Sequence, residues 1–176
     1  MAAIELIGGN GYTYDFVTPR LLRDAQVLSV WEGPANVQAL EVLRLLAPRY
    51  GGFKLFGSKI LAIAESADGL PELARALRTS LAECAEAAKF VGSGPDQSAR
   101  HARRLMAFMA RLLAAALLVE QAARTGKADG GRKALVARAC VERHLAPPPR
   151  RGIGDETDWI YQSFDTFVQP DREALA

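Results

Sequence analysis

The residues with the clearest chemical potential lie in the segment Trp31-Glu32-Gly33-Pro34. Pro34 suits the first turn of a helix, so Glu32 precedes the positive end of that helix and its free N–H groups. That position favours the ionised carboxylate, whereas Trp31 disfavours it by excluding water. A carboxylate that is charged yet weakly solvated suits a general base. The residues alone leave a commoner interpretation open, namely a glutamate that only complements a helix N-terminus.

A glycine cluster, Gly8-Gly9-Asn10-Gly11, lies upstream of this segment. It forms no Gly-x-Gly-x-x-Gly fingerprint and follows no strand, which excludes a Rossmann site. Glycines end helices and also let the backbone approach a ligand closely, so both interpretations stay open. Between the two segments, Arg23-Asp24 is either a structural pair across a helix interface or a contact to a cofactor phosphate.

The elements that position these residues are predicted to be helices, and the fold class is all-α, an antiparallel helix bundle. Prolines and apolar spacing predict helix starts, and glycine pairs predict the ends. Asp96 or Ser98 is expected to cap the longest helix. The expected helices cover Pro19 to Val30, Pro34 to about Gly51, Phe53 to Ala67, Pro71 to Val91, residues 96–98 to Thr125, Arg132 to Leu145, and a short stretch within Asp155 to Phe167.

Three regions are expected along the chain. Residues 1–67 hold the short helices that flank the chemical segments, and 68–146 form a three-helix unit. Residues 147–176 begin with Pro147-Pro148-Pro149, which cannot continue a helix, and end in an acidic-aromatic tail that docks on another surface.

Composition limits the function classes. The 176 residues fit one compact domain with a tail, and the apolar content is sufficient for a core. Cys84 and Cys140 form no CxxC pair, and His101 and His144 share no metal-ligand spacing with them, so we expect reduced thiols and no metal site. No signal peptide opens the chain, and the longest apolar run has eight residues, which predicts a cytoplasmic protein without a membrane partner.

The charge is unevenly distributed. Residues 98–151 carry 12 basic and 3 acidic side chains, whereas residues 152–176 carry 1 basic and 6 acidic. Arg100, Arg104 and Arg111 recur at helical spacing, so they should be exposed together. Such a stripe is either a solvated helix face or a surface for DNA or another polyanion.

The segment from Glu5 to about Arg44 resembles the C-terminal domain of the acyl-CoA dehydrogenase flavoproteins. That family shows a glycine-glycine-x-glycine-aromatic turn, then arginine-aspartate-alanine, then aromatic-glutamate-glycine-threonine before a helix. This chain has Gly8 to Tyr12, Arg23-Asp24-Ala25, and Trp31 to Pro34 at these places.

The resemblance implies site residues. Glu32 falls on the base that removes the α-proton of an acyl-CoA thioester, with Trp31 and Gly33 beside the substrate. The glycine turn implies contacts to the flavin adenine dinucleotide (FAD) of a neighbouring subunit in a homo-oligomer. Pro34 replaces a threonine or serine and cannot donate that residue's hydrogen bond, so Asn36 is a second candidate. The implied FAD contacts are Glu5, Leu6, Ile7, Gly8, Gly9, Asn36 and Pro34.

The resemblance also implies missing parts. The family has an N-terminal helical domain and a central β-domain, and this chain starts within the last part of the third domain. We expect a truncated gene, a split enzyme or a shortened expression product. Beyond about Lys54, the chain resembles the adaptive alkylation-response branch of the family in its length and its charge. The C-terminal extension of that branch is associated with DNA binding.

Three function classes follow from these observations. The first is a part of an FAD-dependent acyl-CoA dehydrogenase of fatty acid metabolism, inactive without its missing domains. The second is a helical module that binds DNA or another polyanion, and the third is an oligomerisation domain.

Overall fold

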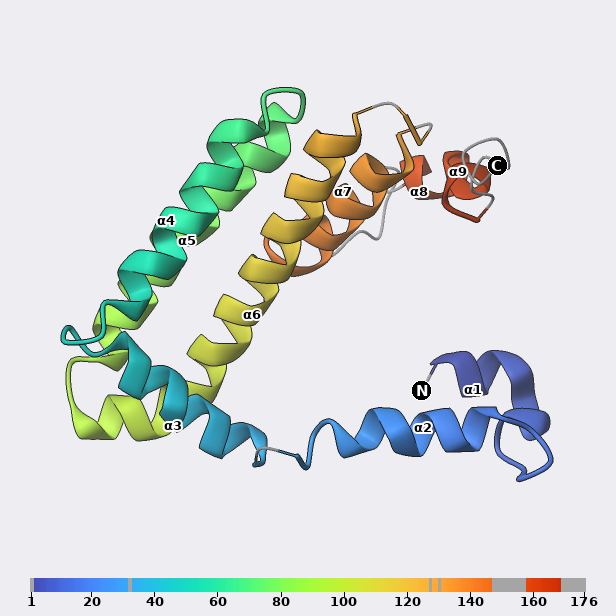
Figure 1. The fold of residues 1–176 in the computed structure, drawn as a ribbon, viewed down its shortest axis with the longest axis horizontal. Helices are drawn as coiled ribbons and strands as arrows, with labels where there is room; N and C mark the ends of the chain where they lie inside the picture. Colours follow the sequence, from blue (N-terminus) through green and yellow to red (C-terminus); the bar gives the residue numbers. More distant parts are fainter. Residues whose placement is uncertain (1, 32, 127, 130, 147–157, 169–176) are drawn as a thin grey trace.

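The computed structural model describes residues 2–31, 33–126, 128–129, 131–146 and 158–168, and within these ranges the chain is helical without strands. Successive long helices run antiparallel, which confirms the all-α bundle (Figure 1). The bundle consists of α3 (Ala35–Leu46), α4 (Gly52–Ser66), α5 (Pro71–Val91), α6 (Pro95–Thr125) and α7 (Arg132–His144).

The core lies along the inner face of α6, which packs against α3, α4, α5 and α7. Leu112, Ala115, Ala116 and Val119 of α6 are fully buried. They recur at three- and four-residue spacing and therefore share one face. The neighbouring helices contribute Ile60 and Ile63 from α4, Leu77 and Cys84 from α5, and Ala137 and Val141 from α7.

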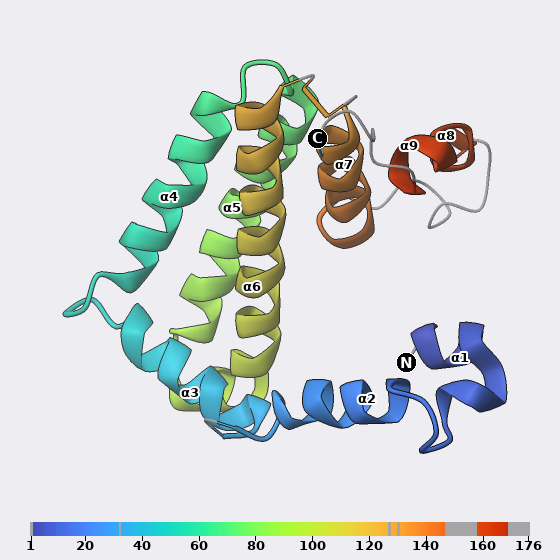
Figure 2. The ribbon, with the colours of Figure 1, turned by 45° about the vertical axis from the view of Figure 1, so that its right-hand side comes forward.

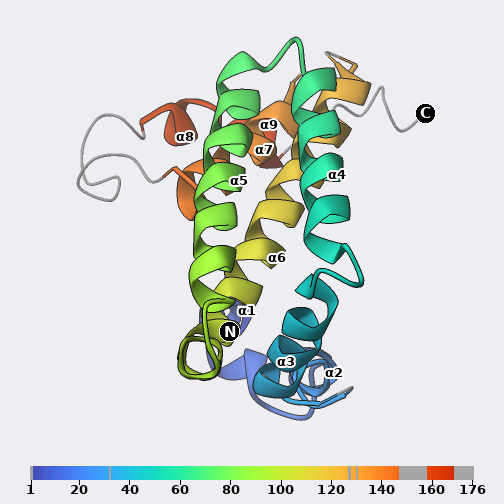
Figure 3. The same ribbon diagram turned by 90° about the vertical axis from the view of Figure 1, so that its left-hand side faces the viewer.

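Two polar contacts fix α4 against the longer helices. Lys59 Nζ donates a hydrogen bond of 2.9 Å to Glu120 Oε1 of α6, and this bond is the main reason that the pKa of Glu120 lies below its ordinary value. Arg78 of α5 donates to the carbonyl oxygen of Ala64 at 2.8 Å. α4 thus shares its core with α5 and α6 (Figure 3), while the division at residue 67 stays a prediction.

An N-terminal arm, residues 2–31, projects from the bundle (Figures 1 and 2). It contains α1 (Ala2–Ile7), the 3-10 helix η1 (Gly8–Gly11) and α2 (Thr18–Val27). α1 packs against η1, and neither α1 nor α2 makes a substantial contact with the bundle. The predicted helix from Pro19 to Val30 is shorter at its C-terminal end, because turns follow Val27.

The predicted bounds of α4 to α7 agree with the structure to within three residues, and Pro71 to Val91 is confirmed as stated. The helix predicted to run from Pro34 to about Gly51 instead ends at Leu46, because a bend and turns occupy residues 47–50. The predicted cap of α6 is wrong. Gly94 occupies the N-cap position without a side-chain hydrogen bond. The Ser98 hydroxyl instead donates to the carbonyl oxygen of Val91, and Asp96 accepts a hydrogen bond from Arg100.

The aromatic tail docks on α7, as predicted, but it forms two short helices, α8 (Asp158–Gln162) and α9 (Phe164–Val168). The guanidinium carbon of Arg138 lies 4.0 Å from the ring centroid of Trp159, and Arg132 donates to the carbonyl oxygen of Phe167. Pro147-Pro148-Pro149 and the first part of the predicted tail helix lie outside the described residues.

By length and composition alone, α6 is long and apolar enough to cross a membrane. Core helices of bundles pass the same test, and one such helix is weak evidence. α6 packs against four other helices. The absence of a membrane partner stays a prediction.

We predict that Leu112→Ala destabilises the bundle by about 2–5 kcal/mol, because it leaves a cavity in a fully buried site. Leu113→Ala is the matched control, since Leu113 on the same helix is 36% exposed and should cost much less. Urea unfolding followed by circular dichroism measures both. A loss for Leu112→Ala no larger than for Leu113→Ala would contradict this core.

We also predict that the protein loses stability at alkaline pH because of the buried thiol of Cys84. Burial raises the pKa of its thiol from 9.0 to about 11. The unfolded thiol therefore ionises first, and the stabilisation is complete below pH 9.0 and lost as the pH rises towards 11. In urea unfolding across this range, Cys84→Ala should lose less stability than the natural chain. Equal pH dependence of the two proteins would be inconsistent with a buried thiol.

Candidate functional site

The glycine turn lies at the far end of the arm. Gly8 has φ of 67°, a left-handed conformation that ends α1, so the helix-end interpretation is confirmed. Position 11 requires glycine because the backbone of Ile4 lies close to it: a Cβ at Gly11 would lie 2.9 Å from the carbonyl oxygen of Ile4. A Cβ at Gly8 or Gly9 would meet no atom within 4 Å. The outer side of the turn is therefore open to an external group.

The side chains before the turn are also exposed. Glu5 lies on α1, Ile7 is about half exposed, and Leu6 keeps 89% of its surface accessible. Among the residues implied as FAD contacts, those from Glu5 to Gly9 thus form one open wall on this chain.

The second chemical segment lies where the arm joins the bundle. Glu32 lies outside the described residues. Gly33 has φ of 98°, and a Cβ there would lie 3.1 Å from Val37 Cγ1. Both the backbone conformation and the packing therefore favour glycine. Trp31 is 61% exposed.

Pro34 occupies the N-cap of α3, so the helix starts one residue later than predicted, and Asn36 is exposed in its first turn. The glycine turn and the Trp31 to Asn36 segment lie at opposite ends of α2 (Figure 1). α2 has ten residues, which corresponds to about 15 Å along its axis. The structure does not bring the two segments together within one chain.

Arg23 was predicted to form a structural pair with Asp24 across a helix interface, or to contact a cofactor phosphate, but the structure places it against an aromatic ring. Its guanidinium carbon lies 5.2 Å from the ring centroid of Tyr14, and the part of the chain that the structure describes shows no ion pair between Arg23 and Asp24. Both Arg23 and Tyr14 are exposed, so this contact ties α2 to the loop before it.

The arm exposes many large apolar side chains to solvent. In a compact protein such residues are normally buried against a neighbouring element. Those exposed by more than half are Leu6, Tyr12, Tyr14, Val17, Leu21, Leu28, Val30 and Trp31.

The predicted arginine stripe lies on the N-terminal half of α6. Arg100, Arg104 and Arg111 are all exposed, whereas Leu105 and Leu112 are buried on the opposite side. Arg100 Nε donates to Asp96 Oδ1 at 2.9 Å, so one of the three charges is partly neutralised. The exposure predicted for the stripe is confirmed; its ligand is a matter for experiment.

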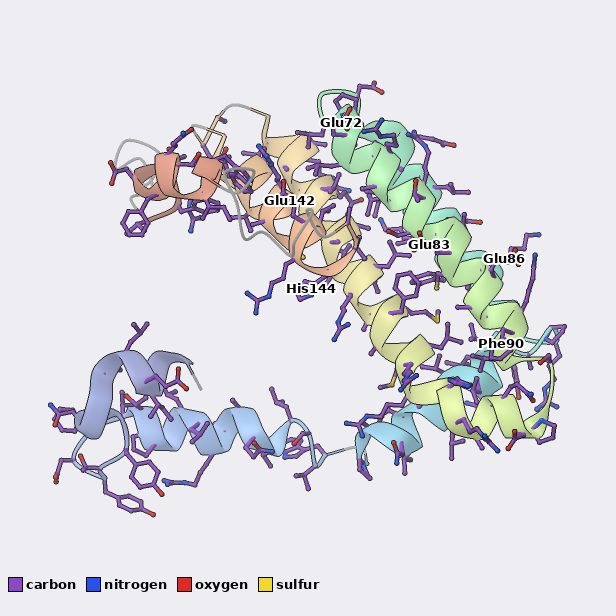
Figure 4. All side chains as sticks on the ribbon, turned by 180° about the vertical axis from the view of Figure 1, so that it is seen from behind. Glu72, Glu83, Glu86, Phe90, Glu142 and His144 are labelled. Carbon is purple, nitrogen blue, oxygen red and sulfur yellow. The ribbon has the colours of Figure 1, made fainter. Side chains whose placement is uncertain are left out.

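The histidines are not gathered into a site. The His101 ring packs near Phe90, with centroids 5.5 Å apart, and His144 is exposed at the end of α7 (Figure 4). Cys84 and Cys140 are free thiols. Among the described residues, no three metal-ligating side chains cluster.

Sequence reasoning missed a cleft of about 770 Å³ between α5 and α7. Ser80 lies on its wall and is 3% exposed. A signal was available, because Ser80 is a polar residue at a core position of α5, between Leu77 and Cys84 in a three- and four-residue repeat.

Two family models match the chain. Residues 53–150 match the acyl-CoA dehydrogenase 11 C-terminal domain-like family, and residues 1–47 match the acyl-CoA dehydrogenase C-terminal domain. The turn between α3 and α4 lies between the two matches.

Three relatives illustrate the similarity. Acyl-CoA dehydrogenase family member 11 of Caenorhabditis elegans is 30% identical over 81% of this chain, which spans 24% of that protein. Putative acyl-CoA dehydrogenase AidB of Escherichia coli is 33% identical over 48% of this chain and 16% of its own length. The short-chain specific acyl-CoA dehydrogenase of Clostridium acetobutylicum is 42% identical over 23% of this chain and 11% of its own length.

No solved structure matches the chain. The chain spans about a quarter or less of the length of these relatives. The helical fold, the glycine turn and the two adjoining family matches agree, and the chain belongs to the acyl-CoA dehydrogenase family as a C-terminal domain.

Proposed function

We propose that this chain is the C-terminal part of an FAD-dependent enzyme that dehydrogenates acyl-CoA thioesters between the α- and β-carbons, and that it is inactive without the other domains. The observation that carries the proposal is the arm, which matches the acyl-CoA dehydrogenase C-terminal domain and leaves its large apolar side chains exposed. Cytoplasmic location and homo-oligomeric assembly belong to the same proposal.

The exposed arm supports dependence on other domains. Side chains such as Leu6, Leu28 and Trp31 gain about 1.5–3 kcal/mol each when fully buried, but the bundle of this chain does not cover them. A separate protein surface that covers the arm would supply this burial and also the remaining walls of the site.

The position of the glycine turn supports a contact with a group held elsewhere. Gly8 and Gly9 leave open space where a side chain would stand, so the backbone can lie close to the phosphates of FAD. The described residues fit one wall of such a site. When bound there, the flavin would supply the acceptor for the hydride of the β-carbon.

The separation of the glycine turn from the Trp31 to Asn36 segment supports a different role for each in the enzyme. The Trp31 to Asn36 segment lies about one α2 length from the glycine turn. In the proposed homo-oligomer, each segment would serve a different FAD. Glu32 would take the α-proton from its position before α3, where the helix N-terminus favours the ionised carboxylate. The left-handed Gly33 beside it lets the backbone turn sharply into α3.

We predict that the isolated chain retains no flavin absorbance after gel filtration, and that a complex with the missing domains oxidises acyl-CoA. In that complex, Glu32→Gln should lower turnover by about 10²–10⁴-fold while flavin stays bound, because the amide keeps the shape without the basicity. The assay is reduction of an electron-accepting dye.

Glu41→Gln is the matched control, since Glu41 is an exposed carboxylate of α3 that pairs with Arg44. Its turnover should equal that of the natural complex. Flavin retained by the isolated chain would refute the dependence on other domains. Unchanged turnover of Glu32→Gln would rule out Glu32 as the base.

A second candidate function is binding of DNA or another polyanion by the arginine stripe, favoured by the shared exposure of Arg100, Arg104 and Arg111. These positions span 12 residues of α6, or about 16 Å, which suits contacts to several phosphates.

We predict that, if the stripe binds duplex DNA, glutamate at all three positions abolishes binding. The logarithm of the natural chain's affinity should fall with that of the salt concentration with a slope of about −3, because three phosphate contacts release counterions. Fluorescence anisotropy measures binding, and circular dichroism checks that the bundle stays folded.

The control is glutamate at Arg49, Lys54 and Lys89, which are exposed, lie off the stripe and give the same change in charge. Its binding should fall only modestly. No binding by the natural chain, or equal binding by both triple variants, would leave the stripe as a solvated helix face.

A further inference from the structure

We propose that the cleft between α5 and α7 binds an uncharged, mainly apolar small molecule that carries one hydrogen-bonding oxygen. This site is separate from the arm, and the proposal does not depend on dehydrogenase activity.

The cleft has the size and lining of a small-molecule site. Its volume of about 770 Å³ falls within the usual range for ligand pockets, about 300–1,000 Å³. It follows α5 from Pro71 to Ser80, which corresponds to roughly 14 Å and suits an elongated molecule. The apolar wall consists of Leu70, Leu73, Ala76, Leu135, Val141 and Leu145.

Ser80 supplies the buried polar group inside the cleft, which the exposed Thr79 also lines. Ser80 is the one polar or charged side chain among the described residues that is buried, and the described residues provide no hydrogen-bond partner for its hydroxyl. In the described part of the chain, every fully enclosed side-chain oxygen or nitrogen has a hydrogen-bond partner. Because the Ser80 hydroxyl has no such partner, it is not fully enclosed and faces open space. That space is the cleft, which Ser80 lines. A ligand oxygen placed there would complete its hydrogen bonding.

The charges at the cleft favour an uncharged ligand. Glu72 pairs with Arg75 on α5, and Glu142 pairs with Arg138 on α7, where Nε and Oε1 are 2.7 Å apart. Figure 4 shows Glu72 near one end of α5 and Glu142 on the adjacent α7. Each cation is matched within its own helix. A charged head beside Ser80 would therefore lose water without gaining an opposite charge.

The tail holds the α7 side of the cleft in place. Trp159 of α8 stacks on Arg138, and its Nε1 donates to Glu142 Oε2 at 3.1 Å. Both members of the α7 pair thus have a second partner, which restrains Arg138 from turning towards an anion in the cleft. An apolar molecule with a neutral oxygen matches both the wall and the fixed charges.

Titration of the full chain with 1-octanol tests the proposal, with octanoate and octylammonium at neutral pH as charged analogues. In ¹H–¹⁵N correlation spectra, 1-octanol should produce saturable shifts of α5 and α7 amides. The charged analogues should bind at least tenfold more weakly, because the site offers no unpaired opposite charge.

Ser80→Ala should weaken 1-octanol about fivefold, which is the effect of one neutral hydrogen bond. Ser58→Ala, which removes an exposed hydroxyl of α4, is the matched control and should leave binding unchanged. Ala76→Phe should abolish binding by filling the cleft. Leu135→Phe tests the same point from α7, so that a folding defect in one variant does not decide the result.

Four outcomes would overturn the proposal. They are the absence of saturable shifts up to the solubility limit of 1-octanol, shifts centred outside α5 and α7, octanoate binding as tightly as 1-octanol, and unchanged affinity in Ser80→Ala.

Discussion

Burial of the inner face of α6 is the interaction on which the rest of the structure depends. Leu112, Ala115, Ala116 and Val119 exclude water completely while four other helices pack against α6. Alanines at two of these positions let the neighbouring backbones approach closely, and Leu112 fills the volume that remains. Both α5 and α7 pack against α6, and the cleft lies between these two helices.

The arm, in contrast to α6, leaves its large apolar side chains exposed. Its helices carry apolar residues at spacings that predict burial, yet α1 packs against η1 and α2 lacks a substantial contact with the bundle. The bundle therefore has a hydrophobic core of its own, whereas the arm exposes the side chains that would complete another one. The residues implied in dehydrogenation all belong to the arm or to its junction with α3.

Much of the bundle was predictable because local signals coincide with packing. Pro71 begins α5, Gly92 follows its last residue, and its core residues recur at helical spacing. The cap of α6 was mispredicted because the Ser98 hydroxyl reaches the carbonyl oxygen of Val91, a contact that depends on how the chain turns between α5 and α6. Likewise, Arg23 stacks on Tyr14 because the preceding loop folds back, which helical spacing cannot reveal.

The candidate sites show the same distinction between local and tertiary information. Left-handed Gly8 and Gly33 were detectable as glycines in motifs, since backbone conformation is a local property. The distance between those motifs depends on α2 and on the loop between the glycine turn and α2. The Ser80 cleft depends on the separation of two helices more than 40 residues apart along the chain. A lone serine in an apolar repeat signals such a site only when the facing helix leaves its hydroxyl in open space, and α7 does so here.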